Sequence, residues 1–150
     1  YLDRLAELTW LETERDSLLL INVHFEAWDG PTREIQSQIV LDIFNMYADS
    51  YPIILLGDFN CTLPYAENAF NEMTIQLILN YPNISSVIKE KDYLSNSMKY
   101  FTFNSEEPYQ KIDYIFFNNK FLRHIETKNI LPPSNISDHL PVMSSFIFVD

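Results

Sequence analysis

The most constraining feature of this sequence is a pair of short apolar segments that end in polar residues, with a helix-like segment between them. The apolar segments are 17–25 (SLLLINVHF) and 51–56 (YPIILL), and the second runs directly into GDFN. Runs this short and this apolar are typical of buried β-strands, and we expect 17–25 to be buried on both faces. Between them, apolar residues recur at helical spacing over about 32–48, after Pro31. The first third of the chain therefore predicts a strand, a helix and a second strand.

The rest of the chain predicts more strands than helices. A second, less regular helix is expected over 66–79, and the remaining apolar segments fall at 100–103, 112–117, 125–131 and 140–149. The last three follow one another without helical connectors, which favours antiparallel neighbours. The sequence therefore predicts an α+β fold with sheets as its core.

Composition narrows the class of function. A chain of 150 residues forms one domain, and its formal net charge of −11 argues weakly against tight, non-specific binding to nucleic acid. With this charge, a phosphate-bearing substrate needs a divalent cation at the site. The single cysteine, Cys61, excludes an internal disulfide and a cysteine-based zinc site. No apolar run could span a membrane and no signal peptide opens the chain, so we expect a cytoplasmic protein.

Polar residues interrupt the first two predicted strands at their ends. The alternation of a strand places Asn22 and His24 on one face. Asp58 and Asn60 also project to a common side if the chain stays extended beyond the second strand. Gly57, one of only two glycines, allows the backbone to turn there or to approach another group closely.

A third interruption lies in the most hydrophobic strand of the C-terminal half. Asp113 stands in the sequence KIDYIFF, where a carboxylate is costly unless it is paired or hydrogen-bonded. The sequence SDHLPV, which precedes the last strand, offers a partner in Asp138 or His139. We therefore expect these two distant segments to meet.

Each of these clusters alone has a structural explanation, as a core histidine, a turn, a buried acid or the end of a loop. Together they supply the groups that metal-assisted hydrolysis of phosphate esters needs: acidic oxygens, a base, an amide and imidazoles. A serine triad is excluded, because Ser137, Asp138 and His139 are contiguous and no G-x-S-x-G elbow exists. The three histidines also lack the spacing of a zinc site.

Four segments, INVHFE, PIILLGDFN, KIDYIFFNN and SDHLPV, resemble the successive motifs of the endonuclease/exonuclease/phosphatase superfamily, in the family's order. This group of metal-dependent phosphohydrolases includes pancreatic-type deoxyribonucleases, abasic-site endonucleases and inositol-polyphosphate 5-phosphatases. The resemblance runs from about residue 4 to the end. It implies a four-layer αββα sandwich of mostly antiparallel sheets with outer helices. Residues 1–150 would form the C-terminal part of that domain, because no Gln-Glu motif, which carries the family's principal metal ligand, is present.

The resemblance also implies roles for the polar residues at the ends of the first two strands. His24 would contact the phosphoryl group and assist the leaving oxygen. Asp58 would orient or deprotonate the attacking water. Asn60 would hold that water or a phosphate oxygen, and Asn22 would shape the phosphate pocket.

The C-terminal residues complete the implied site. Asp113 would pair with His139, fix its tautomer and favour its charged form against the phosphate. Asp138 would be a direct or water-mediated metal ligand. The implied cofactor is Mg²⁺, with Mn²⁺ as an alternative.

Two functions follow. The first is a Mg²⁺-dependent hydrolase that cleaves phosphate esters, in nucleic acid or in small phosphorylated molecules, by in-line attack of an activated water. The second is a truncated, non-catalytic binding or structural module of the same fold. By itself the chain would expose the inner face of its sheet, so we expect a homodimer or association with the N-terminal half, and little activity from the fragment alone.

Overall fold

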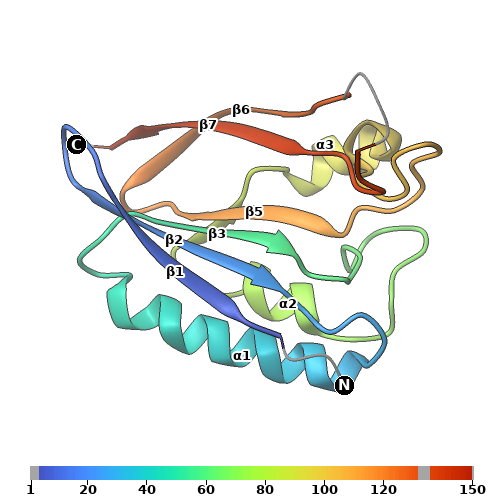
Figure 1. The fold of residues 1–150 in the computed structure, drawn as a ribbon, viewed down its shortest axis with the longest axis horizontal. Coiled ribbons are helices and arrows are strands. Elements are labelled where there is room, and N and C mark those ends of the chain that lie inside the picture. The colour runs from blue at the N-terminus through green and yellow to red at the C-terminus, as the bar shows by residue number, and fades with distance from the viewer. Residues whose placement is uncertain (1–3, 132–135, 150) are drawn as a thin grey trace.

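The computed structural model describes residues 4–131 and 136–149. They form a five-stranded sheet with α1 and α2 on one side, and a two-stranded hairpin on the other side of β5 (Figure 1). In chain order the elements are β1 (Ala6–Glu12), β2 (Ser17–His24), α1 (Gly30–Tyr47), β3 (Ile53–Asp58), α2 (Thr74–Leu79), β4 (Ile84–Ser86), α3 (Glu90–Ser95), the 3₁₀ helix η1 (Ser97–Tyr100), β5 (Asp113–Asn118), β6 (Leu122–Asn129) and β7 (Val142–Phe148).

The order of strands in the large sheet is β1-β2-β3-β5-β4, and β6 pairs with β7 in the hairpin. All described strand pairs are antiparallel except β2 and β3, which are parallel because α1 connects them as a crossover. The predicted α+β fold, with a mostly antiparallel sheet and outer helices, is confirmed. None of the described helices is long and apolar enough to cross a membrane.

The helix between the first two long strands begins where the sequence predicts it. Asp29 caps α1, since its carboxylate accepts a hydrogen bond from the backbone N–H of Thr32 at 2.9 Å. Pro31 lies in the first turn, where its missing N–H costs nothing. Val40 and Phe44 are among the residues that α1 buries against the sheet.

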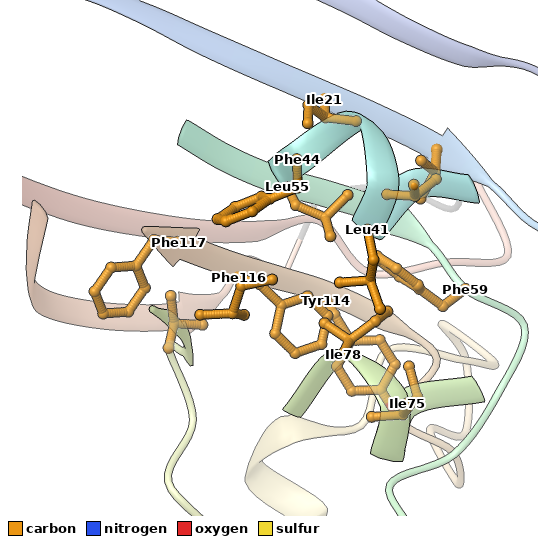
Figure 2. Close-up of a cluster of buried hydrophobic side chains, with 14 of the residues drawn as sticks. Ile21, Leu41, Phe44, Leu55, Phe59, Ile75, Ile78, Tyr114, Phe116 and Phe117 are labelled. Atoms are coloured by element: carbon orange, nitrogen blue, oxygen red, sulfur yellow. The ribbon is translucent and has the colours of Figure 1, made fainter. Parts of the chain in front are cut away.

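The core lies between the sheet and the helices (Figure 2). Phe59 is fully buried and makes edge-on contacts with Phe25, Tyr114 and Phe116. Full burial of each such aromatic side chain stabilises the fold by roughly 1.5–3 kcal/mol. The side chains labelled in the figure are Ile21, Leu41, Phe44, Leu55, Phe59, Ile75, Ile78, Tyr114, Phe116 and Phe117.

The expectation that 17–25 is buried on both faces is wrong for the described structure. Leu19 and Ile21 are fully buried, whereas Asn22 and His24 are exposed. Among the described residues, α1 and α2 cover one face of the sheet, so burial along β2 alternates.

The second predicted helix is also shorter than expected. Only 74–79 of the range 66–79 is helical. The Thr62 hydroxyl accepts a hydrogen bond from the backbone N–H of Phe70 at 2.9 Å, and such local side-chain contacts compete with helix formation.

Three further differences lie in the C-terminal half. The range 100–103 forms no strand, since Tyr100 ends η1 and Phe103 makes only isolated bridges. β4 and α3 were not predicted. β5 and β6 follow each other closely in the chain but belong to different sheets, because β3 and β4 already occupy both edges of β5. β6 begins at Leu122, three residues before the predicted strand 125–131.

Candidate active site

Strand register brings three predicted site residues into one row. The parallel pairing of β2 with β3 sets His24 opposite Asp58, and the antiparallel pairing of β3 with β5 sets Asp58 opposite Asp113. His139 joins them from the segment before β7, which bridges to Phe103. Four residues that are far apart in the sequence therefore meet at one end of the sheet.

Gly57 is required by the close packing of β2 against β3. Its φ is +137°, and a Cβ built there would lie 1.9 Å from the carbonyl oxygen of Val23. No side chain fits at that distance. The glycine that precedes Asp58 is thus a requirement of the strand pairing that places the carboxylate.

Asp58 lies between two imidazoles. Its Oδ2 is 3.5 Å from Nε2 of His24 and 4.0 Å from Nε2 of His139, while its Oδ1 accepts the backbone N–H of Asn60 at 2.8 Å. Burial raises the pKa of Asp58, and the nearby Asp113 raises it further, against the opposing effects of Asn60 and the two histidines. A carboxylate with a raised pKa is a better proton acceptor.

His139 is held by the predicted partner. Its Nδ1 lies 2.9 Å and 3.1 Å from the two carboxylate oxygens of Asp113, and its ring packs against Phe103 at 5.0 Å. Burial lowers the pKa of His139, but the hydrogen bond and charge of Asp113 outweigh it, so the pKa is raised overall. The predicted meeting of these two segments is confirmed, and Nε2 of His139 faces Asp58.

Behind Asp113 lies a buried cation that sequence reasoning missed. Lys111 is 1% exposed, and its Nζ donates to the backbone carbonyl of Asp113 and lies over the ring of Tyr114. Burial lowers the pKa of Lys111 to about 8, partly offset by the charge of Asp113. The sequence did contain an indication of it, because Lys111 stands two positions before Asp113, next to an apolar strand where a charged residue requires a partner.

The remaining predicted residues lie around this row. Asn60 adopts a φ of +48°, and its Nδ2 donates to the backbone carbonyl of Phe25 at 3.0 Å. Asn22 is exposed on the same face of β2 as His24. Asp138 is exposed beside His139, and its charge contributes to the raised pKa of that histidine. The roles of Asn60, Asn22 and Asp138 in binding stay predictions.

A second ion pair adjoins His24 and was also missed. Nη1 of Arg4 lies 2.9 Å from Nε2 of His24, and Nε of Arg4 lies 3.9 Å from Oε2 of Glu26. Glu26 continues the alternation of Asn22 and His24 at the next position on that face, which is the signal that could have found it. Nothing in the sequence around Arg4 indicates this contact.

The row contains a set of atoms that could hold a metal ion. Ligand atoms of Asp58, Asp113 and His139 all lie within 4.8 Å of one another. Two carboxylates provide the oxygen donors that hard divalent cations prefer, so the donor set fits such an ion.

A cavity of about 300 Å³ opens beside these residues, with apolar side chains such as Leu56, Ile115 and Val142 in its lining. A larger hollow of about 1140 Å³ lies elsewhere, and its lining includes His124 but none of the predicted site residues. The chemistry of the lining, rather than its size, therefore identifies the candidate active site.

Comparison with known proteins agrees with this geometry. Residues 3–139 match the Endonuclease/Exonuclease/phosphatase family. The chain belongs to this family, whose members are hydrolases of phosphoesters, and the resemblance of the four sequence motifs is confirmed.

Solved structures share the fold. The human Nocturnin catalytic domain with bound sulfate is similar at a TM-score of 0.72 and 23% identity, over 97% of this chain and 53% of that one. TDP2 of D. rerio in complex with a single-strand DNA product gives 0.72 and 15%, over 96% and 62%. A mannosyl-6-phosphatase of Bacteroides thetaiotaomicron gives 0.66 and 17%, over 88% and 52%. At these identities the likeness shows the fold alone.

The chain spans about half the length of the Nocturnin and mannosyl-6-phosphatase structures. No curated protein matches the sequence significantly. The family is therefore established, while the activity and substrate of this particular member are matters for proposal.

Proposed function

We propose that this protein contributes the water-activating half of a Mg²⁺-dependent phosphoric ester hydrolase. The observation that carries the proposal is the position of Asp58, between the imidazoles of His24 and His139 and next to a second carboxylate. A base flanked by two groups that can donate to a phosphoryl oxygen is what attack of water on phosphorus requires.

Asp58 is the proposed base. Its Oδ1 is fixed by the backbone N–H of Asn60, so Oδ2 remains to accept a proton from water. The raised pKa of Asp58 favours that transfer. The oxygen of the water forms the new bond to phosphorus, the ester bond breaks on the opposite side, and the leaving oxygen takes a proton.

His139 and His24 are the proposed contacts to the phosphoryl group. Asp113 accepts from Nδ1 of His139, which leaves Nε2 to donate to a phosphoryl oxygen, and the raised pKa of His139 keeps more of it charged. His24 lies on the other side of Asp58 and is exposed, and its proposed role is to assist the leaving oxygen. Asn22 and Asn60 are proposed as further contacts to the phosphate, as the family resemblance implies.

The proposed metal ion is Mg²⁺, with Mn²⁺ as the alternative. The exposed carboxylate of Asp138 is a proposed ligand, and the carboxylates of Asp58 and Asp113 lie close enough to add oxygen donors. A bound divalent cation would neutralise phosphate charge in a chain of net charge −11.

The proposed substrates are nucleic acid or small phosphorylated molecules. Both classes occur among the similar structures, one bound to a single-strand DNA product and another described as a mannosyl-6-phosphatase. The negative net charge favours single-stranded or small substrates over duplex DNA. The cytoplasmic location stays a prediction.

The test is hydrolysis of bis-p-nitrophenyl phosphate and p-nitrophenyl phosphate by the full-length protein with Mg²⁺. We expect Asp58→Asn and His139→Ala each to lower kcat about 100- to 10,000-fold, as loss of a general base or of a transition-state donor does. His124→Ala, a histidine outside the site, is the control and should retain activity.

Full turnover in both site variants would remove the assignment. The non-catalytic alternative is separated by calorimetric titration with Mg²⁺. If the full-length protein neither binds Mg²⁺ nor hydrolyses either compound, the binding-module alternative is favoured.

A further inference from the structure

We propose that Arg4 is a substrate-contacting residue whose guanidinium binds a non-bridging oxygen of the phosphoryl group beside His24. This inference rests on the proposed function, because it assigns a further residue to the same site. The observation behind it is a cation that lies next to a predicted catalytic histidine without a good partner of its own.

Arg4 adds a fifth, positively charged residue to the row of site residues, next to His24. The contacts run from Arg4 to His24 at 2.9 Å, from His24 to Asp58 at 3.5 Å, from Asp58 to His139 at 4.0 Å, and from His139 to Asp113 at 2.9 Å. From His24 to Asp113, imidazoles and carboxylates alternate, and Arg4 adds a second basic group next to His24. The guanidinium stands at one end, where it adds a permanent positive charge on the side of His24.

Glu26 holds Arg4 in place but does not saturate it. The backbone N–H of Trp28 donates to Oε1 of Glu26 at 3.2 Å, which leaves Oε2 to face Nε of Arg4 at 3.9 Å. The backbone of Glu26 is fixed in turn by Gln36 and Arg33, which bond to its N–H and carbonyl. A distance of 3.9 Å is an ion pair without a hydrogen bond.

The hydrogen bonding of Arg4 is therefore incomplete. Its Nε is buried and has no hydrogen-bond partner among the described residues, and its Nη1 contacts the imidazole of His24 rather than an anion. Buried donors are nearly always paired in native proteins, so an unpaired one calls for a reason. An anion that enters beside His24 would supply the missing acceptor.

The chemistry of phosphate favours this arginine. The side of the site next to His24 carries the carboxylates of Glu26 and Asp58, so an anionic substrate needs a fixed cation there. The planar fork of a guanidinium matches two phosphate oxygens and stays charged at every working pH. On binding, the 2.9 Å contact between Arg4 and His24 is exchanged for a charge-assisted contact to the non-bridging oxygen of the substrate.

The experiment compares four variants of the full-length protein, Arg4→Ala, Arg4→Lys, Glu26→Gln and the control Arg123→Ala, an exposed arginine on β6. The measurements are kcat and KM for bis-p-nitrophenyl phosphate with Mg²⁺, and the Kd of inorganic phosphate. We expect Arg4→Ala to lower kcat/KM about 100-fold and to raise the phosphate Kd about 10-fold. Arg4→Lys should recover part of both losses. Glu26→Gln should cause smaller losses of the same sign, because the loss of the carboxylate that holds the guanidinium is partly offset by the removal of a negative charge beside the phosphate.

The outcomes distinguish this proposal from the proposed function. If wild type is active and Arg4→Ala binds phosphate as tightly as Arg123→Ala, the role of Arg4 is refuted while the hydrolase stands. If wild type neither hydrolyses the ester nor binds phosphate, both proposals fall. Should Arg4→Ala fold poorly in thermal unfolding, an unchanged phosphate Kd in both Arg4→Lys and Glu26→Gln overturns the proposal.

Discussion

The two faces of the five-stranded sheet differ in how deeply their side chains are buried. The helix face consists of side chains that are fully buried under α1 and α2, namely Leu19, Ile21, Ile53, Leu55 and Phe116. The opposite face, which we call the open face, consists of half-buried side chains between the edge strand and the hairpin, namely Leu18, Leu20, Ile54, Leu56 and Ile115. The candidate active site lies at one end of the open face.

This difference shows where the sheet can accommodate carboxylates, whose burial is unfavourable. Asp58 and Asp113 lie on the open face, where burial is partial and the pKa of Asp58 is raised. On the helix face the same carboxylates would be removed from water without partners, at a much greater cost. One face of the sheet therefore provides stability, and the other carries the candidate active site.

The largest expected difference in stability is between substitutions at two neighbouring residues of β5, one on each face of the sheet. Phe116→Ala should lower the free energy of unfolding by about 3–5 kcal/mol, because it leaves a cavity in a fully buried aromatic cluster. Ile115→Ala on the open face should cost only about 1 kcal/mol, since its side chain is half-buried. Urea denaturation of both variants checks the comparison, and equal losses would show that the open face is as well packed as the helix face.

The next prediction concerns what covers the open face. We expect the 150-residue chain alone to associate, either with itself or with the N-terminal half of the domain when that half is supplied, because apolar side chains on this face remain partly in contact with water. Leu56→Asp should weaken the association about 10- to 100-fold, whereas Ile35→Asp, on the exposed side of α1, should not.

Sedimentation velocity over a range of concentrations measures this effect. A stable monomer at all concentrations, for the chain alone and in the presence of the N-terminal half, would count against the prediction.

Sequence reasoning found those parts of the site that local patterns encode. Alternation places Asn22 and His24 on one face, and the cost of an acid in an apolar strand indicates that Asp113 needs a partner such as His139. Both inferences need only the residues next to each position. The helix over 32–48 is also encoded locally, by the spacing of apolar residues over several consecutive turns.

What the sequence could not indicate depends on contacts between distant segments. The contact of Arg4 with His24 joins the segment before β1 to the end of β2. The separation of β5 from β6 is decided by which strands occupy the edges of β5, and periodicity carries no such information. The helix expected over 66–79 failed because side-chain contacts of the preceding loop replace its first turns.

The smallest effect concerns pH and the pair of His139 with Asp113. The pKa of His139 is raised in the folded state, because Asp113 bonds to Nδ1 and outweighs the effect of burial. A group with a raised folded pKa adds stability that is fully present below its unfolded value of 6.5 and is lost as pH rises through the folded value. Wild type should therefore exceed His139→Gln by about 1 kcal/mol at pH 5.5, and this difference should shrink by pH 9.

Urea denaturation with EDTA present, at several pH values, measures this difference without a bound cation. His124→Gln, which changes a histidine outside the site, provides the matched control for general effects of removing an imidazole. A stability difference for His139→Gln that grows with pH would mean that the folded state prefers the neutral imidazole. The open face would then lack the charged His139 that the proposed phosphate contact requires, and this part of the contrast between the two faces would be wrong.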